Sequence, residues 1–224
     1  MPFQEENTTL AFDTPLPAII GRPKESPRDL GIVFAHGSSN DMTHPTLEAM
    51  ARGFSQNGYP TLRFNFPYRA AGRKSPDPEH RLLAAMAHAM AHLRKTIPCR
   101  RLILAGKSLG ARMAAQGCAA GQLDADGLIF LGYPLHAPGK KDAPRTAPLE
   151  ALSIPLLFFQ GTRDPFCNME TLQPVFDGLT APAQLEIIQN GDHGFQLPKT
   201  SPGTPDQVHD QMLGVAIDWL SRWN

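Results

Sequence analysis

The chain has 224 residues, which suits one domain with a sizeable hydrophobic core and is short for two independent domains. Lysine plus arginine equals aspartate plus glutamate at 21 each, and no block of like charge stands out along the chain. This balance argues against a nucleic-acid partner and against binding to an anionic membrane surface.

Six short apolar runs, each bounded by glycine, proline, asparagine or aspartate, alternate with segments of helical period. The runs span 31–36, 61–66, 101–106, 127–132, 155–161 and 185–191. Strands of this length separated by helices predict an α/β fold, with a mostly parallel sheet and helices on both faces. Residues 8–23, ahead of the first run, are expected to add one or two antiparallel strands at the sheet edge.

Two helices have clear boundaries in the sequence. Apolar residues recur at spacings of three and four over 79–97, and Pro98 ends that helix. The last helix begins at Thr204, where Gln207 completes a capping box and Pro205 takes the first helical position. Its apolar face carries Val208, Met212, Val215, Trp219 and Trp223. Because the sequence shows neither an internal repeat nor a linker, we interpret residues 1–224 as a single domain.

Several classes of protein are disfavoured by what the sequence lacks. The N-terminal segment has no basic start followed by an apolar core, and no apolar run approaches the roughly 20 residues that a bilayer span needs. The three cysteines are widely spaced without a CxxC pair, which suits reduced thiols. His88 and His92 have a metal-ligand spacing, but Ala89 stands where an H-E-x-x-H zinc site needs glutamate. We expect a cytoplasmic protein without a metal or other cofactor.

The stretch Gly106-Lys107-Ser108-Leu109-Gly110 matches G-x-S-x-G at the junction of a predicted strand and a predicted helix. In a nucleophile elbow, glycines leave room for a tight turn, and backbone strain lifts the serine hydroxyl above the sheet at a helix N-terminus. The motif alone is a weak signal, because such a turn can be purely structural or can cradle a phosphate. A P-loop is disfavoured because G-x-x-x-x-G-K-[ST] is absent.

Two further residues complete the pattern downstream. Asp164 and His193 follow the strands predicted at 155–160 and 185–189, and open α/β sheets place their sites at such carboxyl ends. Taken singly, Asp164 fits a turn residue and His193 a loop histidine. The order serine, acid, histidine instead favours a catalytic triad, with Ser108 as nucleophile, His193 as general base and Asp164 orienting the imidazole.

A tetrahedral intermediate also needs two hydrogen-bond donors for its oxyanion. One is predicted to be the backbone N–H of Leu109. The other is predicted to be the backbone N–H of Ser38, in the loop after the first central strand, with Ser39 as its substitute. Gly37 allows a close turn in that loop, and His36 is interpreted as a structural residue.

These residues resemble the α/β-hydrolase superfamily from Gly31 onward. The chain is similar to small, cap-poor, dienelactone-hydrolase-like hydrolases in the motifs AHGSSNDMTHP, LRFNFPYRAAGR, LILAGKSLGARMA, LGYPLHAPGK, FFQGTRDPF and GDHGF. That group includes relatives of a testis-expressed protein and of a chromatin-complex subunit. A true dienelactone hydrolase would have cysteine at the position of Ser108 and a haloalkane dehalogenase would have aspartate, so both chemistries are disfavoured.

The pocket is expected to be open and shallow, because the segment between 132 and 155 is too short for a lipase-like cap. Tyr68 and Tyr133 are expected to line it, with packing of the strand ends as the alternative of equal weight. Cys167 is interpreted as a bystander thiol. Five basic residues are interpreted as solvated surface charge, with a cationic rim as the alternative: Arg69, Arg73, Lys107, Lys140 and Lys141.

The leading hypothesis is a cofactor-free serine hydrolase that cleaves carboxylic esters or thioesters of small or protruding acyl groups through an acyl-enzyme on Ser108. One alternative is a hydrolase-like scaffold that binds a protein partner, and another is a small peptidase or amidase with the same triad. The complete set of Ser108, Asp164 and His193 argues against a pure scaffold, which has no chemical need for all three. The sequence does not specify the oligomeric state.

Overall fold

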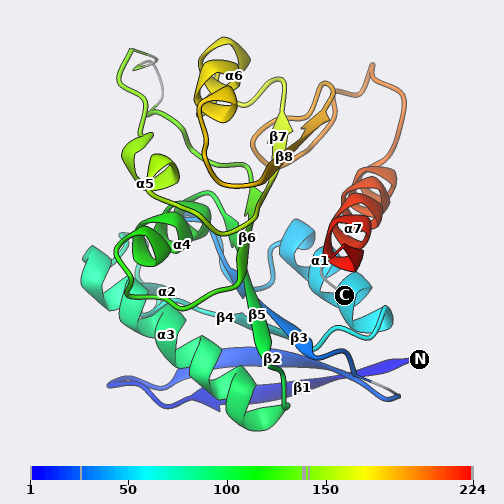
Figure 1. Ribbon diagram of the computed structural model, residues 1–224. Coiled ribbons are helices and arrows are strands. Elements are labelled where there is room, and N and C mark those ends of the chain that lie inside the picture. The colour runs from blue at the N-terminus through cyan, green and yellow to red at the C-terminus, as the bar shows by residue number, and fades with distance from the viewer. Residues whose placement is uncertain (1, 26, 138–139, 141, 223–224) are drawn as a thin grey trace.

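One eight-stranded sheet organises the molecule, in the order β1-β2-β4-β3-β5-β6-β7-β8 (Figure 1). The computed structural model describes residues 2–25, 27–137, 140 and 142–222. The strands are β1 (Phe3–Leu10), β2 (Leu16–Pro23), β3 (Leu30–Ala35), β4 (Thr61–Phe64), β5 (Arg101–Lys107), β6 (Gly127–Leu131), β7 (Leu156–Gly161) and β8 (Ala183–Ile188). Strand β2 pairs antiparallel with β1 and β4, and the other neighbours are parallel, so the predicted edge strands and mostly parallel sheet are confirmed.

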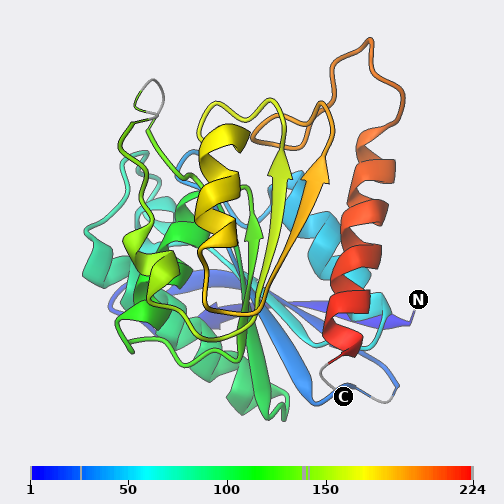
Figure 2. The same cartoon turned by 45° about the horizontal axis from the view of Figure 1, so that its top comes forward.

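Helices cover both faces of the sheet (Figure 2). Helices α1 (Pro45–Gln56) and α7 (Pro205–Ser221) pack on one face. The opposite face carries α3 (Glu79–Thr96), α4 (Leu109–Ala119) and α6 (Met169–Asp177), together with the four-residue helices α2 (Pro67–Ala70) and α5 (Ala147–Glu150). The helical layers confirm the predicted α/β architecture.

The central strands are buried on both sides, and their alternate residues face different layers. On β3, Val33 and Ala35 join the core that includes α3 and α4, whereas Ile32 and Phe34 join the core that includes α1 and α7. All of β3 is buried. Because both faces are covered, such a strand is apolar at every position instead of alternating, which explains the continuous runs seen in the sequence.

The two helices delimited from the sequence also agree with the structure. The helix predicted over 79–97 is α3, one residue shorter at its C-terminus. At α7 the capping box is formed, since Gln207 N donates to Thr204 Oγ1 at 3.3 Å and Thr204 N donates to Gln207 Oε1 at 2.9 Å. Trp223, predicted on the apolar face of this helix, lies outside the described residues.

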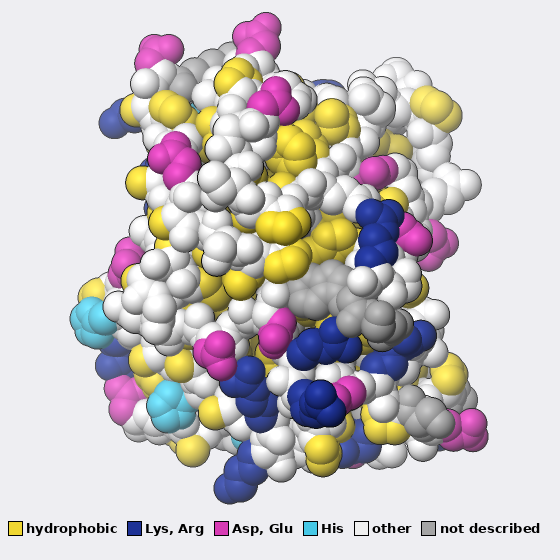
Figure 3. Space-filling model, viewed as in Figure 1, with side chains coloured by type: hydrophobic (Ala, Val, Ile, Leu, Met, Phe, Trp, Pro, Cys, Tyr) yellow, Lys and Arg dark blue, Asp and Glu magenta, His cyan; other side chains and the backbone are white. Residues whose placement is uncertain are grey.

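No cap covers the carboxyl edge of the sheet. Between β6 and β7, the described residues form only one helix, the short α5. Across the ranges that the structure describes, none of the helices has the length and apolarity to span a membrane. Figure 3 shows basic and acidic side chains interspersed on one face of the molecule, in keeping with their equal numbers in the sequence.

Helix α4 approaches the sheet so closely that its second residue must be glycine. A Cβ on Gly110 would lie 2.3 Å from the carbonyl oxygen of Ala35 on β3. We expect Gly110→Ala to lower the free energy of unfolding by about 1–3 kcal/mol, because backbone must shift to admit the methyl group. On the exposed side of α7, nothing lies within 4 Å of a Cβ on Gly214. There, Gly214→Ala should raise the free energy of unfolding by about 0.5–1 kcal/mol. Urea unfolding measures both changes, and equal stability of the two variants would contradict this packing.

Candidate active site

Ser108 forms the turn between β5 and α4 in a backbone conformation that favours glycine, with φ 52° and ψ −108°. Such conformations cost roughly 1–3 kcal/mol in other residues and persist only where the surroundings impose them. The flanking glycines allow the turn to be this tight, since a Cβ on Gly106 would lie 2.3 Å from the backbone nitrogen of Ala111. The strained strand-to-helix turn expected from G-x-S-x-G is therefore present, with the serine at the N-terminus of α4.

Asp164 and His193 form a hydrogen-bonded pair beyond the ends of β7 and β8. His193 Nδ1 donates to Asp164 Oδ2 at 2.7 Å, and the Asp164 side chain is 0% exposed. Gln160 Nε2 donates to the same oxygen at 2.7 Å, while the backbone N–H of Phe166 donates to Asp164 Oδ1 at 2.8 Å. Both carboxylate oxygens of Asp164 therefore accept hydrogen bonds, and the bond from Nδ1 fixes the imidazole in the tautomer that carries its proton there.

The second ring nitrogen of His193 is the one that a triad would use. His193 Nε2 is buried and has no hydrogen-bond partner among the described residues. The imidazole lies 4.5 Å, centroid to centroid, from the ring of Phe166, and Phe166 lines the same pocket as Ser108. His193 thus contacts a wall residue of the pocket that Ser108 lines, and no hydrogen bond joins the two side chains. Catalytic contacts of this kind are often long before substrate binds.

Gln160 belongs to the site but was not identified from the sequence. It is the one amide in the buried strand β7 and is 1% exposed. A polar side chain in an otherwise apolar buried strand needs a hydrogen-bond partner, and here that partner is Asp164. This exception to the apolar pattern is the signal that could have identified it.

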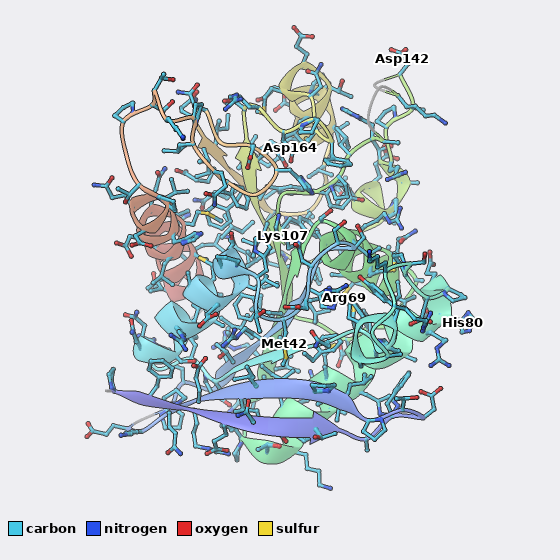
Figure 4. The ribbon with its side chains drawn as sticks, turned by 180° about the vertical axis from the view of Figure 1, so that it is seen from behind. Met42, Arg69, His80, Lys107, Asp142 and Asp164 are labelled. Carbon is cyan, nitrogen blue, oxygen red and sulfur yellow. The ribbon has the colours of Figure 1, made fainter. Side chains whose placement is uncertain are left out.

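Lys107, the residue before the candidate nucleophile, is buried beneath the loop that carries His193. Its Nζ donates to the backbone oxygen of His193 at 2.6 Å and lies 5.6 Å from the ring centroid of Phe195. Burial lowers the pKa of Lys107 to about 8, although the carboxylates of Asp164 and Asp192 act in the opposite direction. Figure 4 shows Lys107 in the interior of the molecule, below Asp164.

The interpretation of Lys107 as solvated surface charge is therefore wrong, and so is its alternative as part of a cationic rim. Its side chain is only 2% exposed, because the last residue of β5 points under the neighbouring loop. Two other residues of that set are surface cations held in ion pairs, Arg69 with Asp41 at 3.6 Å and Arg73 with Asp77 at 2.6 Å. Lys141 lies outside the described residues.

The loop after β8 is held by its own side chains as well as by Lys107. Asp192 Oδ1 accepts from the backbone N–H groups of Gly194 and Gln196, at 2.7 and 2.9 Å. Asn190 and Phe195 adopt positive φ angles of 59° and 63°. These constraints fix the backbone on both sides of His193, so the imidazole is positioned before any substrate arrives.

The loop after β3 is anchored against the site by buried polar groups. The His36 ring is 0% exposed, and burial lowers the pKa of its imidazole to about 4. The neutral ring donates through Nδ1 to Gly37 O at 2.8 Å and accepts at Nε2 from Phe66 N at 3.0 Å. The structural role expected for His36 is confirmed.

Both residues assigned to the oxyanion hole lie at the pocket. Ser38 and Leu109 line it together with Ser108, whereas Ser39 is not among its lining residues. The assignment of their backbone N–H groups as donors remains a prediction.

Of the two alternatives of equal weight for Tyr68 and Tyr133, lining of the pocket is wrong and packing at the strand ends agrees with the structure. Both side chains are 0% exposed and neither borders the pocket that contains Ser108. Tyr68 donates its hydroxyl to the backbone oxygen of Ser38 at 2.9 Å, which holds the loop after β3 in place. Tyr133 packs edge-on against Phe130, at 5.2 Å between ring centroids. Both tyrosines follow strands whose ends remain inside the aromatic core, so their rings turn inward.

The pocket beside Ser108 has a volume of about 270 Å³. Its apolar walls include Leu82, Met113 and Phe166. Cys167 is 1% exposed and does not line it, and burial raises the pKa of its thiol to about 12, in keeping with a bystander. No cluster of three or more metal-ligating side chains occurs within the described part of the chain.

The buried ammonium of Lys107 should make stability depend on pH in a defined window. In the unfolded chain its pKa returns to the ordinary value of 10.5, whereas in the folded protein it is about 8. Between these two pKa values the unfolded state binds more protons than the folded state. The contribution of Lys107 to the free energy of unfolding therefore rises with pH, by roughly 1.4 kcal/mol per pH unit at most. Measured by urea unfolding, the free energy of unfolding of the wild type should therefore rise relative to that of Lys107→Met between pH 8 and pH 10. The variant Lys199→Met, at an exposed site, controls for loss of one positive charge, and parallel profiles of wild type and Lys107→Met would contradict the prediction.

Comparisons with known proteins agree with this fold. A family model described as an alpha/beta hydrolase domain matches residues 28–221. Among solved structures, a lidless α/β serine hydrolase from Xanthomonas campestris superposes with a TM-score of 0.77 at 20% identity, covering 100% of this chain and 96% of that one.

Two further solved structures are similar over nearly their full lengths. A dienelactone hydrolase from Anabaena variabilis has a TM-score of 0.75 at 18% identity, with 99% of each chain covered. Est1E from Butyrivibrio proteoclasticus, solved with bound ferulic acid, has a TM-score of 0.75 at 14% identity, with 96% of this chain and 99% of that chain covered. At these identities the structural neighbours establish the fold, and the family match covers most of the sequence. The chain belongs to the α/β-hydrolase domain family.

Proposed function

We propose that the protein is a serine hydrolase that cleaves carboxylic esters or thioesters of small or protruding acyl groups through an acyl-enzyme on Ser108. The observation that carries this proposal is the strained Ser108 in a pocket whose wall residue Phe166 contacts the His193 imidazole, which a buried carboxylate holds in one tautomer. A hydroxyl is a poor nucleophile at neutral pH, and a positioned base is what activates it. The name of one structural neighbour, the dienelactone hydrolase, supports an ester substrate.

The proposed steps follow from the roles of the three side chains. His193 Nε2 takes the proton of Ser108 as its Oγ attacks the acyl carbonyl, and the negative oxygen accepts hydrogen bonds from the N–H groups of Leu109 and Ser38. The protonated imidazole then gives its proton to the leaving alcohol or thiol. Water then attacks the acyl carbonyl as His193 takes one of its protons, and the imidazolium returns that proton to Ser108 Oγ as the bond to the acid breaks. Asp164 stabilises the imidazolium in both halves of the cycle.

The open carboxyl edge bears on the size of the substrate. No cap closes over the pocket in the described residues, and the pocket itself is small at about 270 Å³. A short acyl group can enter it, or a longer one can protrude into solvent. Hydrolysis of long-chain lipid by interfacial activation of a lid is disfavoured.

Substitution of the nucleophile gives the most direct test. We expect Ser108→Ala to reduce kcat for short 4-nitrophenyl esters by at least about 10³-fold, because removal of a nucleophile disables the triad as a unit. The variant Ser153→Ala, at an exposed serine away from the pocket, should keep wild-type kcat and controls for general effects of removing a hydroxyl. Retention of turnover in Ser108→Ala would refute the assignment. Faster turnover of a matched anilide than of the ester would instead indicate an amidase.

Covalent labelling tests activation of Ser108 without a choice of substrate. A fluorophosphonate probe should add one adduct to the wild type, because an activated serine attacks its phosphorus atom. Neither Ser108→Ala nor His193→Ala should be labelled at a comparable rate, and intact mass measures all three. A folded wild type that stays unlabelled would favour a hydrolase-like scaffold that binds a protein partner.

A further inference from the structure

One turn of α4 beyond the candidate nucleophile, a second polar side chain borders the pocket. Arg112 lies four residues after Ser108, and its backbone N–H donates to the Ser108 carbonyl at 3.0 Å. Residues at this spacing lie on the same side of a helix. Both side chains accordingly line the pocket, so a molecule bound at Ser108 would lie within reach of the Arg112 guanidinium.

One nitrogen of the half-buried Arg112 guanidinium lacks a hydrogen-bond acceptor among the described residues. Its Nε is buried without a hydrogen-bond partner among the described residues, and no ion pair involves its side chain there. By contrast, the nearly buried Arg63 is paired with Glu5. Burial lowers the pKa of Arg112, and the nearby Arg145 acts in the same direction. A cation with unmade hydrogen bonds, at the wall of a pocket, is a ready site for an anion.

Arg145 adds a second positive charge to the same pocket. It follows β6 in the segment that replaces a cap, and it also lines the pocket. Its backbone is held on both sides, since its N–H donates to Leu135 O at 2.6 Å and its carbonyl accepts from the Tyr133 hydroxyl at 3.3 Å. The exposed side chain thus extends from a fixed point beside Arg112.

The acidic residues of the pocket form no ion pair with Arg112. Asp77 is paired with Arg73 at 2.6 Å and lies 3.9 Å from Arg81. Glu79, in the first turn of α3, is exposed, and its charge only partly opposes the effect of burial on the pKa of Arg112. The end of the pocket formed by α4 therefore keeps an excess of positive charge.

We propose that Arg112, assisted by Arg145, forms a subsite for a carboxylate carried by the substrate, so that the preferred esters or thioesters are acidic. The proposal rests on the proposed hydrolase function and specifies its substrate class. The planar guanidinium matches a carboxylate in a two-pronged hydrogen bond. The apolar walls at Leu82 and Met113 suit a methylene chain between the reacting carbonyl and that carboxylate.

A pair of esters that differ only in charge tests the subsite. The 4-nitrophenyl monoester of adipic acid carries a terminal carboxylate, and its neutral counterpart carries a terminal carboxamide of the same shape. In the wild type we expect kcat/KM for the carboxylate ester to exceed that for the carboxamide ester by about tenfold or more, and the ratio to fall as salt screens the charges. In Arg112→Gln the ratio should fall to about one, with turnover of the carboxamide ester retained.

Two further variants separate the subsite from general effects of charge or folding. Arg112→Lys keeps the charge without the two-pronged geometry, so it should retain part of the preference even if Arg112→Gln folds poorly. Arg100→Gln, at an exposed arginine at the opposite edge of the sheet, should leave the ratio unchanged. Equal ratios in wild type, Arg112→Gln and Arg112→Lys would overturn the proposal.

Failure of the subsite and failure of the proposed function give different results. If the wild type hydrolyses both esters at equal rates and Ser108→Ala hydrolyses neither, the hydrolase stands and the subsite is refuted. If the wild type hydrolyses neither ester, the subsite is judged by calorimetric binding of both esters to Ser108→Ala with and without Arg112→Gln. Tighter binding of the carboxylate ester that is lost with Arg112→Gln supports the subsite, and equal binding overturns it.

Discussion

The whole site depends on the tight turn at Ser108, which leaves no room for a side chain at Gly106 or Gly110. Gly110 brings α4 against the Ala35 carbonyl at the end of β3, and the residues that follow β3 form the candidate oxyanion loop. In that loop, a Cβ on Gly37 would lie 3.4 Å from the Ser108 Cβ. One packing contact therefore sets the positions of the candidate nucleophile and of the loop beside it. The strain at Ser108 is sustained by the burial of α4 against the sheet.

The opposite wall of the site depends on two buried charges that act on the same residue. Asp164 holds His193 through its ring, and Lys107 holds it through its backbone carbonyl. A buried charge is costly unless hydrogen bonds compensate it. The carboxylate of Asp164 has such compensation from Gln160 and from backbone N–H, whereas the ammonium of Lys107 has a carbonyl and the face of an aromatic ring. Burial accordingly lowers the pKa of the Lys107 ammonium to about 8.

The sequence was sufficient to predict the fold and to nominate the candidate triad because both leave local signals. Apolar runs bounded by turn residues delimited the strands, and the Thr204 capping box marked the start of α7. Tyr68 and Tyr133 were left undecided and Lys107 was placed incorrectly, for a common reason. Each follows or ends a strand at the correct edge, but whether its side chain points into the pocket or under a loop depends on neighbouring segments far away in the chain. Arg112 shows the same limit, since its spacing from Ser108 is visible in the sequence and its lack of partners is not.

The absence of a cap changes how such a site can discriminate among substrates. An enclosed pocket selects by shape, because every wall contacts the ligand and exclusion of water strengthens each polar contact. In the described residues no cap closes over the pocket beside Ser108, so shape restrains only the part of the substrate nearest the serine. Discrimination must then come from a few directional contacts on the walls that remain. Helix α4 supplies one such wall, and the polar group that it presents one turn beyond Ser108 is an arginine without a protein partner among the described residues. Charge on the substrate is therefore the property that this open site is best built to recognise.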